Sequence, residues 1–340
     1  MSVDIDVVVV GGGPVGLASA IEARLAGLTV AIIEPRDSTI DKACGEGLMP
    51  GALPLLARLG VDPAGMPLRG VSYLSPHRRA DHLFRTGAGR GVRRTALHDA
   101  LLSRAEQLGV ERLCSRVETF TQDSAGVTVN GLRAGWLFGA DGLHSAVRRI
   151  AGLDDPRPAG TRRYGLRQHF AVAPWSDLIE VHWAEHAEVY VTPVAADTVG
   201  IAILGPQRTD FAATVRGIPA LAERLDGATA ASSLRGAGPF RQRALTPSAG
   251  RVLLVGDASG YVDAITGEGL RLGLDQARLA VAHVTGGAGY DRAWARSTRD
   301  FRRLTSGLVR AATGPLRGVI VPAASALPQV YGAVVERLAR

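Results

Sequence analysis

Cysteine is scarce in this sequence, and its spacing fits no common framework. Cys44 and Cys114 are the only two cysteines among 340 residues. Two cysteines cannot build a disulfide framework, and they lack the C-x-x-C spacing of many metal sites. We therefore expect no metal ion in this protein.

Lysine is nearly absent, since Lys42 is the only one in the chain. All other basic residues counted in the net charge of +7 are arginines. The arginines are spread along the chain, and no basic run interleaves with aromatic residues, so the charge does not predict nucleic-acid binding. A basic surface favours anionic cofactors instead.

Long hydrophobic runs are also missing. No apolar stretch reaches the roughly 20 residues that a membrane-spanning helix needs, because charges such as Arg24 and Glu34 interrupt each one. The N-terminus enters "DIDVVVVGGG" without the basic segment of a secretory signal, so we expect a cytoplasmic protein. At 46% hydrophobic residues, the chain can form one large core or two coupled lobes.

The N-terminal region carries a nucleotide-binding pattern. A β-branched apolar run, residues 7–10, predicts a buried parallel strand, and Gly11, Gly13 and Gly16 follow in G-x-G-x-x-G spacing. A helix is expected over about residues 14–26 and a second strand over 30–33, ending at Glu34. This spacing suits a pyrophosphate at the helix N-terminus and a ribose diol at the acid.

Two later segments repeat the strand-then-glycine logic. "WLFGADGLHSAVRRIAGL" places Asp141 after an apolar run, and "RVLLVGDASGYVDAITGEGL" places Asp257 after another. The second segment continues through Gly267 and Gly269 into a long predicted helix. Earlier in the chain, between the N-terminal glycine motif and "WLFGADG", we expect an amphipathic helix that begins at Arg94.

These motifs, in this order, resemble the FAD-dependent oxidoreductases of the para-hydroxybenzoate hydroxylase fold. That superfamily includes aromatic hydroxylases, flavin halogenases and geranylgeranyl reductases, and the resemblance covers about residues 3–285. It implies an α/β fold: a Rossmann-like FAD-binding domain of the GR2 type, a discontinuous substrate domain built on an antiparallel β-sheet, and C-terminal helices. The expected division is 1–67, 87–160 and 240–290 for FAD, 68–86 and 161–239 for substrate, and 291–340 for the helical tail.

The resemblance also implies the residues that bind FAD. In the family the first glycine motif binds the ADP half, the "GADG" segment is associated with NAD(P)H use, and the "GDA" aspartate binds the ribityl chain. Carried over by position and extended to their neighbours, the cofactor-binding residues are Gly11, Gly13, Pro14, Val15, Gly16, Glu34, Pro35, Arg36, Lys42, Ala43, Gly45, Arg94, Asp141, Asp257, Gly267, Gly269 and Leu270.

The remaining segments predict a substrate-binding sheet. Residues 68–86 and 161–205 alternate apolar and polar side chains over short spans. Alternation places Glu188, Tyr190 and Thr192 on one face and Val189 and Val191 on the other, and leaves open which face meets the substrate. Arg167, His169, His182 and Tyr190 are the predicted polar substrate contacts.

Several reactions are compatible with these motifs. The leading expectation is an NAD(P)H-dependent monooxygenase that hydroxylates an aromatic, polyketide-like or otherwise lipophilic small molecule through a flavin hydroperoxide, acting as a monomer or homodimer. "CGEGL" and "YVDAITGEGL" look more like the geranylgeranyl reductases, so hydride transfer in alkene reduction or desaturation stays open. A halogenase, whose W-x-W-x-I-P signature is missing, and a non-enzymatic flavoprotein sensor are weaker alternatives.

The stretch "DKACGEGLMP" is expected to line the flavin. Gly45 and Gly47 would let the backbone approach the cofactor. The resemblance to geranylgeranyl reductases, in which a cysteine of such a motif lies near the reactive face of the flavin, implies that Cys44 is a catalytic residue bordering the substrate cavity. An inert, buried thiol is the competing interpretation. Lys42 could screen the pyrophosphate or face solvent.

Overall fold

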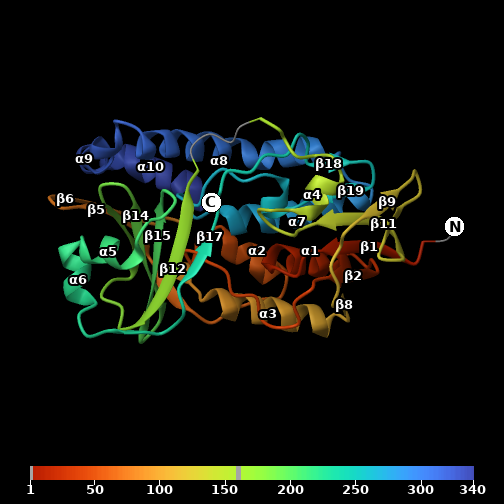
Figure 1. Ribbon diagram of the computed structural model, residues 1–340, viewed down its shortest axis with the longest axis horizontal. Helices are drawn as coiled ribbons and strands as arrows, with labels where there is room; N and C mark the ends of the chain where they lie inside the picture. The colour runs from red at the N-terminus through yellow and green to blue at the C-terminus, as the bar shows by residue number, and fades with distance from the viewer. Residues whose placement is uncertain (1–2, 158–161) are drawn as a thin grey trace.

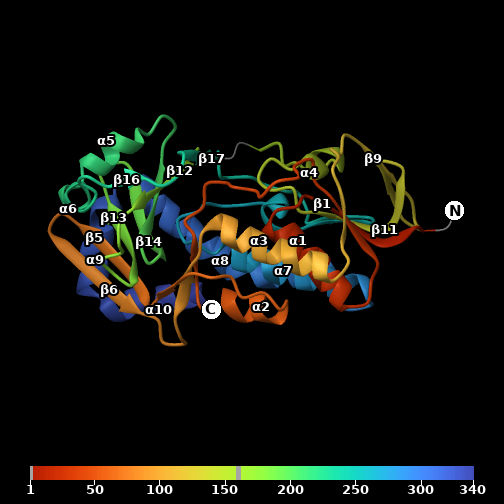
Figure 2. The same ribbon diagram turned by 90° about the horizontal axis from the view of Figure 1, so that it is seen from below.

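The computed structural model describes residues 3–157 and 162–340 and divides into two large sheets with helices on and between them (Figure 1). One sheet lies at the N-terminal end of the molecule, and the other lies at the opposite end beside α9 and α10, as Figure 2 shows from below. Mixed α/β architecture with several sheets and C-terminal helices was predicted, and it is confirmed.

The first sheet is the predicted Rossmann-like layer. Its strands run in the order β18 (Ser248–Ala249), β19 (Val252–Leu254), β11 (Leu132–Gly139), β1 (Ile5–Val10), β2 (Val30–Ile33) and β8 (Glu111–Leu113), with β10 (Val127–Val129) and β9 (Phe120–Gln122) branching from β11. The pairs that join β19, β11, β1, β2 and β8 are parallel. Val7, Val8 and Val9 have no exposed surface, which is the burial on both faces that a parallel strand needs.

Four helices pack side by side against one face of this sheet. They are α3 (Arg94–Gln107), α1 (Pro14–Leu25), α7 (Gly269–Val284) and α8 (Tyr290–Thr313), in that order. The Ala-rich α1 fits closely between sheet and helices because its small side chains are almost all buried. The other face is covered by β9, β10 and α4 (Ala146–Ile150), while α2 (Ala52–Arg58) packs on α7.

The second sheet is antiparallel apart from one parallel pair. Its order is β16 (Thr229–Ala230), β12 (Tyr164–Ala171), β15 (Thr198–Gly205), β14 (Glu188–Ala195), β13 (Leu178–Trp183), β5 (Gly70–Ser75) and β6 (Arg78–Leu83), with β17 (Arg235–Ala237) on β12. The parallel pair, β5 with β13, joins strands that lie far apart in sequence. A third, small sheet contains β3 (Gly47–Leu48), β7 (Gly89–Gly91) and β4 (Met66–Leu68).

The two faces of the second sheet meet different neighbours. Val189, Val191 and Ile201 pack on one side with α5 (Phe211–Arg216) and α6 (Pro219–Arg224). The face that carries Tyr190 and Thr192 meets residues 41–49 and 261–265, at the turns that follow the strands of the first sheet. The alternation pattern did not say which face of this sheet points toward the first sheet. The structure shows that it is the face of Tyr190, which we call the Tyr190 face.

The chain ends in helices that return to the second sheet. After α8 come η2 (Arg317–Val319), α9 (Ile320–Ala326) and α10 (Pro328–Ala339), and η1 (Gly256–Ser259) lies earlier, after β19. The helices α9 and α10 pack on β5 and β6, and the Gly51 N–H donates to the Ala339 carbonyl at 2.8 Å. Among the described residues no single helix has the length and hydrophobicity to cross a bilayer; α9 and α10, with η2, pass together by length and composition but bend by 106°.

Candidate cofactor and substrate site

The three glycines of the G-x-G-x-x-G motif, two in the turn between β1 and α1 and one within α1, have different surroundings. Gly11 has φ +108°, and a Cβ there would lie 2.6 Å from the Ala140 carbonyl oxygen. A Cβ on Gly16 would lie 1.8 Å from the Gly11 oxygen, so this glycine is needed for close packing of helix on strand. A Cβ on Gly13 would meet only Arg94 Nη2, at 3.9 Å. The fold itself thus needs Gly11 and Gly16, whereas Gly13 faces open space.

The N-terminus of α1 presents unpaired backbone donors to that space. Gly13 is the N-cap and supplies no side chain to satisfy the first N–H groups, and Pro14 stands at the first helical turn. Val15 packs against α7 at Gly273, so closely that a Cβ on Gly273 would lie 2.4 Å from the Val15 Cγ2. This arrangement is a binding site for an anion such as a phosphate.

Glu34 lies at the end of β2, beside the glycine turn. Its Oε2 accepts a hydrogen bond from Gly12 N at 2.8 Å, and the Arg36 guanidinium donates to Oε1 at 2.7 Å. Burial acts to raise the pKa of Glu34, but the hydrogen bonds from Arg36 and Gly12 outweigh it, so the pKa is lowered. The carboxylate is ionised, and each oxygen accepts two hydrogen bonds, Oε1 from Arg36 N and Nε and Oε2 from Gly12 N and Arg36 Nη2. A ribose hydroxyl would therefore bind Glu34 in exchange for a bond to the exposed Arg36 side chain.

Two half-buried charges, Arg94 and Asp257, face the same space as Gly13. Burial lowers the pKa of Arg94 and raises the pKa of Asp257, and neither forms an ion pair within the part of the chain described. Arg94 Nε is buried without a hydrogen-bond partner. Lys42 adds an ammonium group. Its pKa is lowered by desolvation and by the positive charges of Arg36 and Arg94, although the residue as a whole is exposed. A ligand with both anionic and hydroxyl groups would satisfy all three side chains.

Asp141 has a structural role and one free atom. Its Oδ2 accepts hydrogen bonds from Ala146 N at 2.7 Å and Val147 N at 3.1 Å, and so it caps the start of α4. Its Oδ1 is buried without a partner. Oδ2 therefore serves as a helix cap, and Oδ1 is left without a partner among the described residues.

The other predicted cofactor residues surround these groups. Pro35 and Arg36 are exposed beyond Glu34, Ala43 is half-buried, and Gly45 is exposed with nothing within 4 Å of a Cβ. At the start of α7, Gly267 has φ +72°, and Leu270 is half-buried. A Cβ on Gly269 would lie 3.0 Å from the Tyr261 ring.

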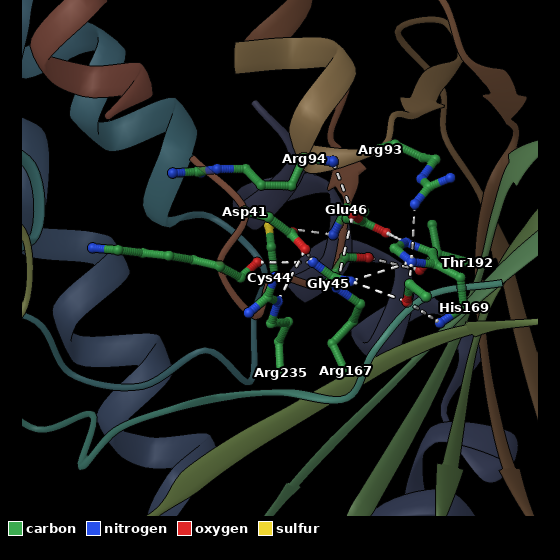
Figure 3. Close-up of polar contacts among 12 residues, drawn as sticks. Asp41, Cys44, Gly45, Glu46, Arg93, Arg94, Arg167, His169, Thr192 and Arg235 are labelled. Atoms are coloured by element: carbon green, nitrogen blue, oxygen red, sulfur yellow. Dashed lines mark hydrogen bonds and ion pairs between the residues drawn. The ribbon is translucent and has the colours of Figure 1, made fainter. Parts of the chain in front are cut away.

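Glu46 joins the loop of residues 41–47 to two other elements (Figure 3). It is buried, has φ +60°, and accepts a hydrogen bond from Arg94 N on Oε1 at 2.8 Å. Its Oε2 lies 2.5 Å from His169 Nε2. Arg167 Nη1 and the Ser232 hydroxyl face the other ring nitrogen, at 3.2 Å and 2.9 Å. Because an arginine only donates, His169 Nδ1 accepts and Nε2–H donates to Glu46.

Further bonds hold the same loop to the second sheet. Arg167 Nη2 pairs with Asp41 and donates to the Lys42 carbonyl at 3.2 Å, and Thr192 Oγ1 donates to the Gly45 carbonyl at 2.9 Å. In Figure 3 the Arg93 side chain also points to His169, while Arg94 extends away from Glu46. Loop, sheet and helix start are thus fixed relative to one another at the Tyr190 face.

Two predicted substrate contacts, Arg167 and His169, are fully buried in this network and already have protein partners. The third, Tyr190, is half-buried, and its hydroxyl donates to the Ile265 carbonyl at 2.9 Å. The fourth, His182, lies on the face of the sheet opposite to Tyr190. It pairs in register with Val189 on the α5–α6 face and lies 3.2 Å from Glu180, because a strand turns alternate side chains to opposite faces.

Sequence reasoning missed Glu46, Asp41 and Ser232 as members of this site. Glu46 carried a local signal, because a charged residue between Gly45 and Gly47 is not needed for a glycine turn and so indicates a role of its own. Asp41 and Ser232 carried no such signal, because their partners are distant in sequence. Asp41 pairs with Arg167, 126 positions away, and Ser232 lies beside His169, 63 positions away. In residues 3–157 and 162–340 no cluster of three or more His, Cys, Asp or Glu could hold a metal.

Comparison with known proteins agrees with the geometry. The family described as "FAD binding domain" matches residues 4–290. The chain belongs to this family. It is 29% identical to a menaquinone reductase of Mycolicibacterium smegmatis, over 86% of this chain and 80% of that protein. It is 28% identical to 12-dehydrotetracycline 5-monooxygenase/anhydrotetracycline 6-monooxygenase of Streptomyces rimosus, over 80% of this chain and 61% of that one.

The fold is also shared with a solved structure, the flavin-dependent brominase Bmp2. The TM-score is 0.82 at 18% identity, covering 98% of this chain and 93% of that one. Membership of the FAD family makes the chain an FAD-dependent oxidoreductase, as the motifs predicted. The groups left without partners around Gly13 fit FAD, which carries a diphosphate and a hydroxyl-rich ribityl chain.

Glu268, the N-cap of α7, gives this FAD protein a testable pH dependence. Burial raises its pKa from 4.5 to about 7, with Arg271 opposing the shift. Between those pH values the folded protein holds a proton that the unfolded chain has lost, so the free energy of unfolding falls as the pH rises. We expect Glu268→Gln to remove roughly 1–3 kcal/mol of this loss, measured by urea unfolding of FAD-free protein at pH 5 and pH 8. Exposed Glu223→Gln is the control, and an unchanged difference between the two pH values in Glu268→Gln would refute the assignment.

Proposed function

We propose that the protein is an NAD(P)H-dependent monooxygenase that hydroxylates an aromatic or polyketide-like small molecule. One observation carries the proposal: the half-buried, unpaired charges of the FAD site lie next to the Tyr190 face of the antiparallel sheet. A cofactor held by those charges and a substrate lying on that face would be neighbours. FAD supplies the redox chemistry, and the chain supplies binding and orientation.

The residues that would hold FAD follow from the groups without protein partners. The α1 N-terminus, Arg94 and Lys42 would hold the diphosphate. Glu34, which already has protein partners, would accept from a ribose hydroxyl in place of a bond to the exposed Arg36 side chain. Asp257 would accept from ribityl hydroxyls, and its negative charge faces Lys42 and Arg94. We propose further that residues 1–67, 87–160 and 240–290 form the FAD-binding part and residues 68–86 and 161–239 the substrate-binding part.

Gly13 tests this placement without disturbing the fold. A Cβ at Gly13 has room in the protein, but it would enter the space proposed for the diphosphate. We expect Gly13→Ala to weaken FAD binding by about 10- to 100-fold, which corresponds to a typical cost of overpacking. The melting temperature of the FAD-free protein should not change.

Titration of FAD into the cofactor-free protein, followed by flavin fluorescence, measures this effect. Gly289→Ala is the matched control, because Gly289 has φ −54° and nothing lies within 4 Å of its Cβ. Equal FAD affinity in both variants would rule out a diphosphate at Gly13.

An arginine-lined cavity supports NAD(P)H as the reductant. Its volume is about 320 Å³, and it is lined by His144, Ser145, Arg148, Arg149, Asp154, Asp155, Arg157, Arg241, Gln242 and Arg243. Arg148 pairs with Asp154 and Arg157 with Asp155, whereas Arg241 lies among other cations: burial, Arg243 and Arg310 lower its pKa. The surplus positive charge suits the phosphates of a dinucleotide, directly after the Asp141 segment.

The chemistry of the Tyr190 face suits a lipophilic substrate. Tyr73, Tyr190 and Tyr261 belong to one apolar cluster with Ile265 and the C-terminal helices. Burial raises the pKa of Tyr190 and Tyr261 well above the usual value, so both hydroxyls stay protonated. The Tyr190 hydroxyl donates to the Ile265 carbonyl, so the Tyr261 hydroxyl is the one that could donate to a substrate. Arg167 and His169 would then act by fixing the loop of residues 41–47 rather than by touching the substrate.

Cys44 is expected to be unreactive. Burial raises the pKa of its thiol, while Arg94 opposes the shift, so little thiolate forms at neutral pH. We predict that iodoacetamide modifies exposed Cys114 at least about tenfold faster than Cys44 at pH 7.5, as read by mass spectrometry of the two peptides. Cys44→Ser should keep FAD and turnover; a loss of turnover with FAD retained would make Cys44 catalytic.

A second candidate reaction is hydride transfer to an alkene or quinone. The menaquinone reductase that this chain resembles aligns over 80% of its own length, whereas the tetracycline monooxygenase aligns over 61% of its length. The "CGEGL" segment, which carries Glu46 and looks like the geranylgeranyl reductases, also favours hydride transfer. Oxygen is a substrate of the first reaction and not of the second.

The experiment that separates the two uses oxygen directly. Purified protein should be yellow and release FAD on denaturation, and NADH or NADPH should reduce it. Turnover under ¹⁸O₂ with one labelled oxygen atom in the product supports the monooxygenase, whereas anaerobic turnover of an alkene or quinone supports the reductase. Absence of FAD from folded protein would contradict both reactions.

A further inference from the structure

The C-terminal end of the chain exposes an unusual amount of apolar surface. Five large apolar side chains in and around η2, α9 and α10 are between 38 and 61% exposed: Leu316, Val319, Leu327, Val330 and Val334. Residues 318–335 contain no Asp, Glu, Lys, Arg or His. We call this surface the apolar tip.

The apolar tip belongs to helices that are firmly attached to the body. On α10, Tyr331 and Val335 are buried against the second sheet, and Glu336 lies 2.8 Å from His82 of β6. Leu327, Val330 and Val334 follow helical spacing on the opposite side. The exposed apolar face is therefore fixed outward and is not a frayed end of the chain.

A stripe of arginines leads along α8 to the apolar tip. Arg292, Arg296, Arg299, Arg303 and Arg310 are all exposed, at intervals of three, four or seven residues that place them along one side of the helix. We call these five residues the arginine stripe. The two acids of α8 already have partners: Asp291 accepts a hydrogen bond from the Ser248 hydroxyl, and Asp300 pairs with Arg337 of α10. Figure 1 shows α8, α9 and α10 together along one edge of the molecule.

We propose that this edge docks on an anionic phospholipid membrane. The apolar tip would enter the interface between headgroups and acyl chains, and the arginine stripe would lie against the negative headgroups. The bend of 106° between η2–α9 and α10 suits helices that lie in the interface. A second copy of this chain fits less well, because two arginine stripes brought together would repel each other. The proposal does not depend on the reaction that the FAD site performs.

The position of the tip gives membrane docking a use. The apolar cluster that buries Tyr331 and Val335 continues through Tyr73 and Tyr190 to Ile265, next to the FAD site. A lipophilic molecule that leaves the bilayer would therefore reach the protein at the end of the molecule that carries the second sheet and its Tyr190 face.

Vesicle binding of the full-length, FAD-loaded protein tests the proposal. We expect co-sedimentation with phosphatidylcholine vesicles that contain phosphatidylglycerol, weaker binding without it, and loss of binding at high salt. Val330→Glu and, separately, Arg299→Glu combined with Arg303→Glu should each weaken binding by about tenfold or more. Leu245→Glu is the matched control, because Leu245 is 54% exposed and lies outside the apolar tip.

Each remaining outcome overturns the proposal. No binding to the anionic vesicles, or equal binding by Val330→Glu and the wild type with both folded by circular dichroism, excludes the apolar tip. Dimers that Val330→Glu dissociates, seen by light scattering without lipid, would assign the tip to a second copy. Binding to duplex DNA with equal affinity and equal loss in the arginine variant would assign the stripe to nucleic acid.

Discussion

Replacing Glu46 by alanine should lower the free energy of unfolding by about 3–5 kcal/mol, because two buried donors lose their acceptor and Arg167 loses a nearby carboxylate. The carboxylate is buried, and both of its oxygens are used, by Arg94 N and by His169. Its loss leaves the His169 N–H and the first N–H of α3 without acceptors, and it removes the negative charge that lies 3.9 Å from Arg167 Nε. Urea unfolding followed by circular dichroism measures the difference.

Two comparisons make the Glu46 result specific. Glu46→Gln keeps an acceptor for Arg94 N and should lose about half as much stability as Glu46→Ala. Glu106→Ala, at an exposed position of α3, should change stability by less than about 0.5 kcal/mol. If Glu46→Ala costs no more than Glu106→Ala, the Glu46 network does not hold the loop.

Replacing Arg94 by methionine should affect FAD binding and stability in different directions. Arg94 is half-buried without an acid partner among the described residues, and its Nε has no acceptor. Methionine removes an unpaired charge, so the cofactor-free protein should be as stable as the wild type or more stable by about 1 kcal/mol. Loss of a charge-assisted bond to a phosphate should weaken FAD binding about 100-fold.

The measurements for Arg94 are a thermal melt without cofactor and an FAD titration. Arg94→Met retains the backbone N–H that donates to Glu46, so the Glu46 network stays intact. Arg116→Met, at an exposed site, should change neither quantity. A variant that loses stability and keeps FAD affinity would show that Arg94 serves the fold and not the cofactor.

Local spacing predicted the parts of the structure that depend on neighbours in sequence. The strand, glycine turn, helix and terminal acid of residues 5–34 need only a few residues to specify each turn, and the predicted helix over 14–26 is observed as Pro14–Leu25. The helix starts at Arg94 and at Gly269 were predicted for the same reason and are also observed.

Contacts between distant segments escaped prediction. Glu46 meets His169 across 123 positions, and Arg167 meets Asp41 across 126. Alternation correctly divided Tyr190 from Val189, but the pattern alone cannot say which face meets a helix and which meets the FAD body. His182, which was predicted as a substrate contact without a face being assigned to it, lies with Val189 on the α5–α6 face.

The order of strands in the two sheets has a consequence for how the chain folds. β1 pairs with β11, which is made more than 120 residues later, and β11 then pairs with β19, later still. β5 waits in the same way for β13. Pairings between such distant segments form slowly, because a long loop must close before any contact rewards it. On the ribosome the glycine turn at residues 11–16 is therefore made first but becomes a rigid binding site only when nearly the whole chain has emerged.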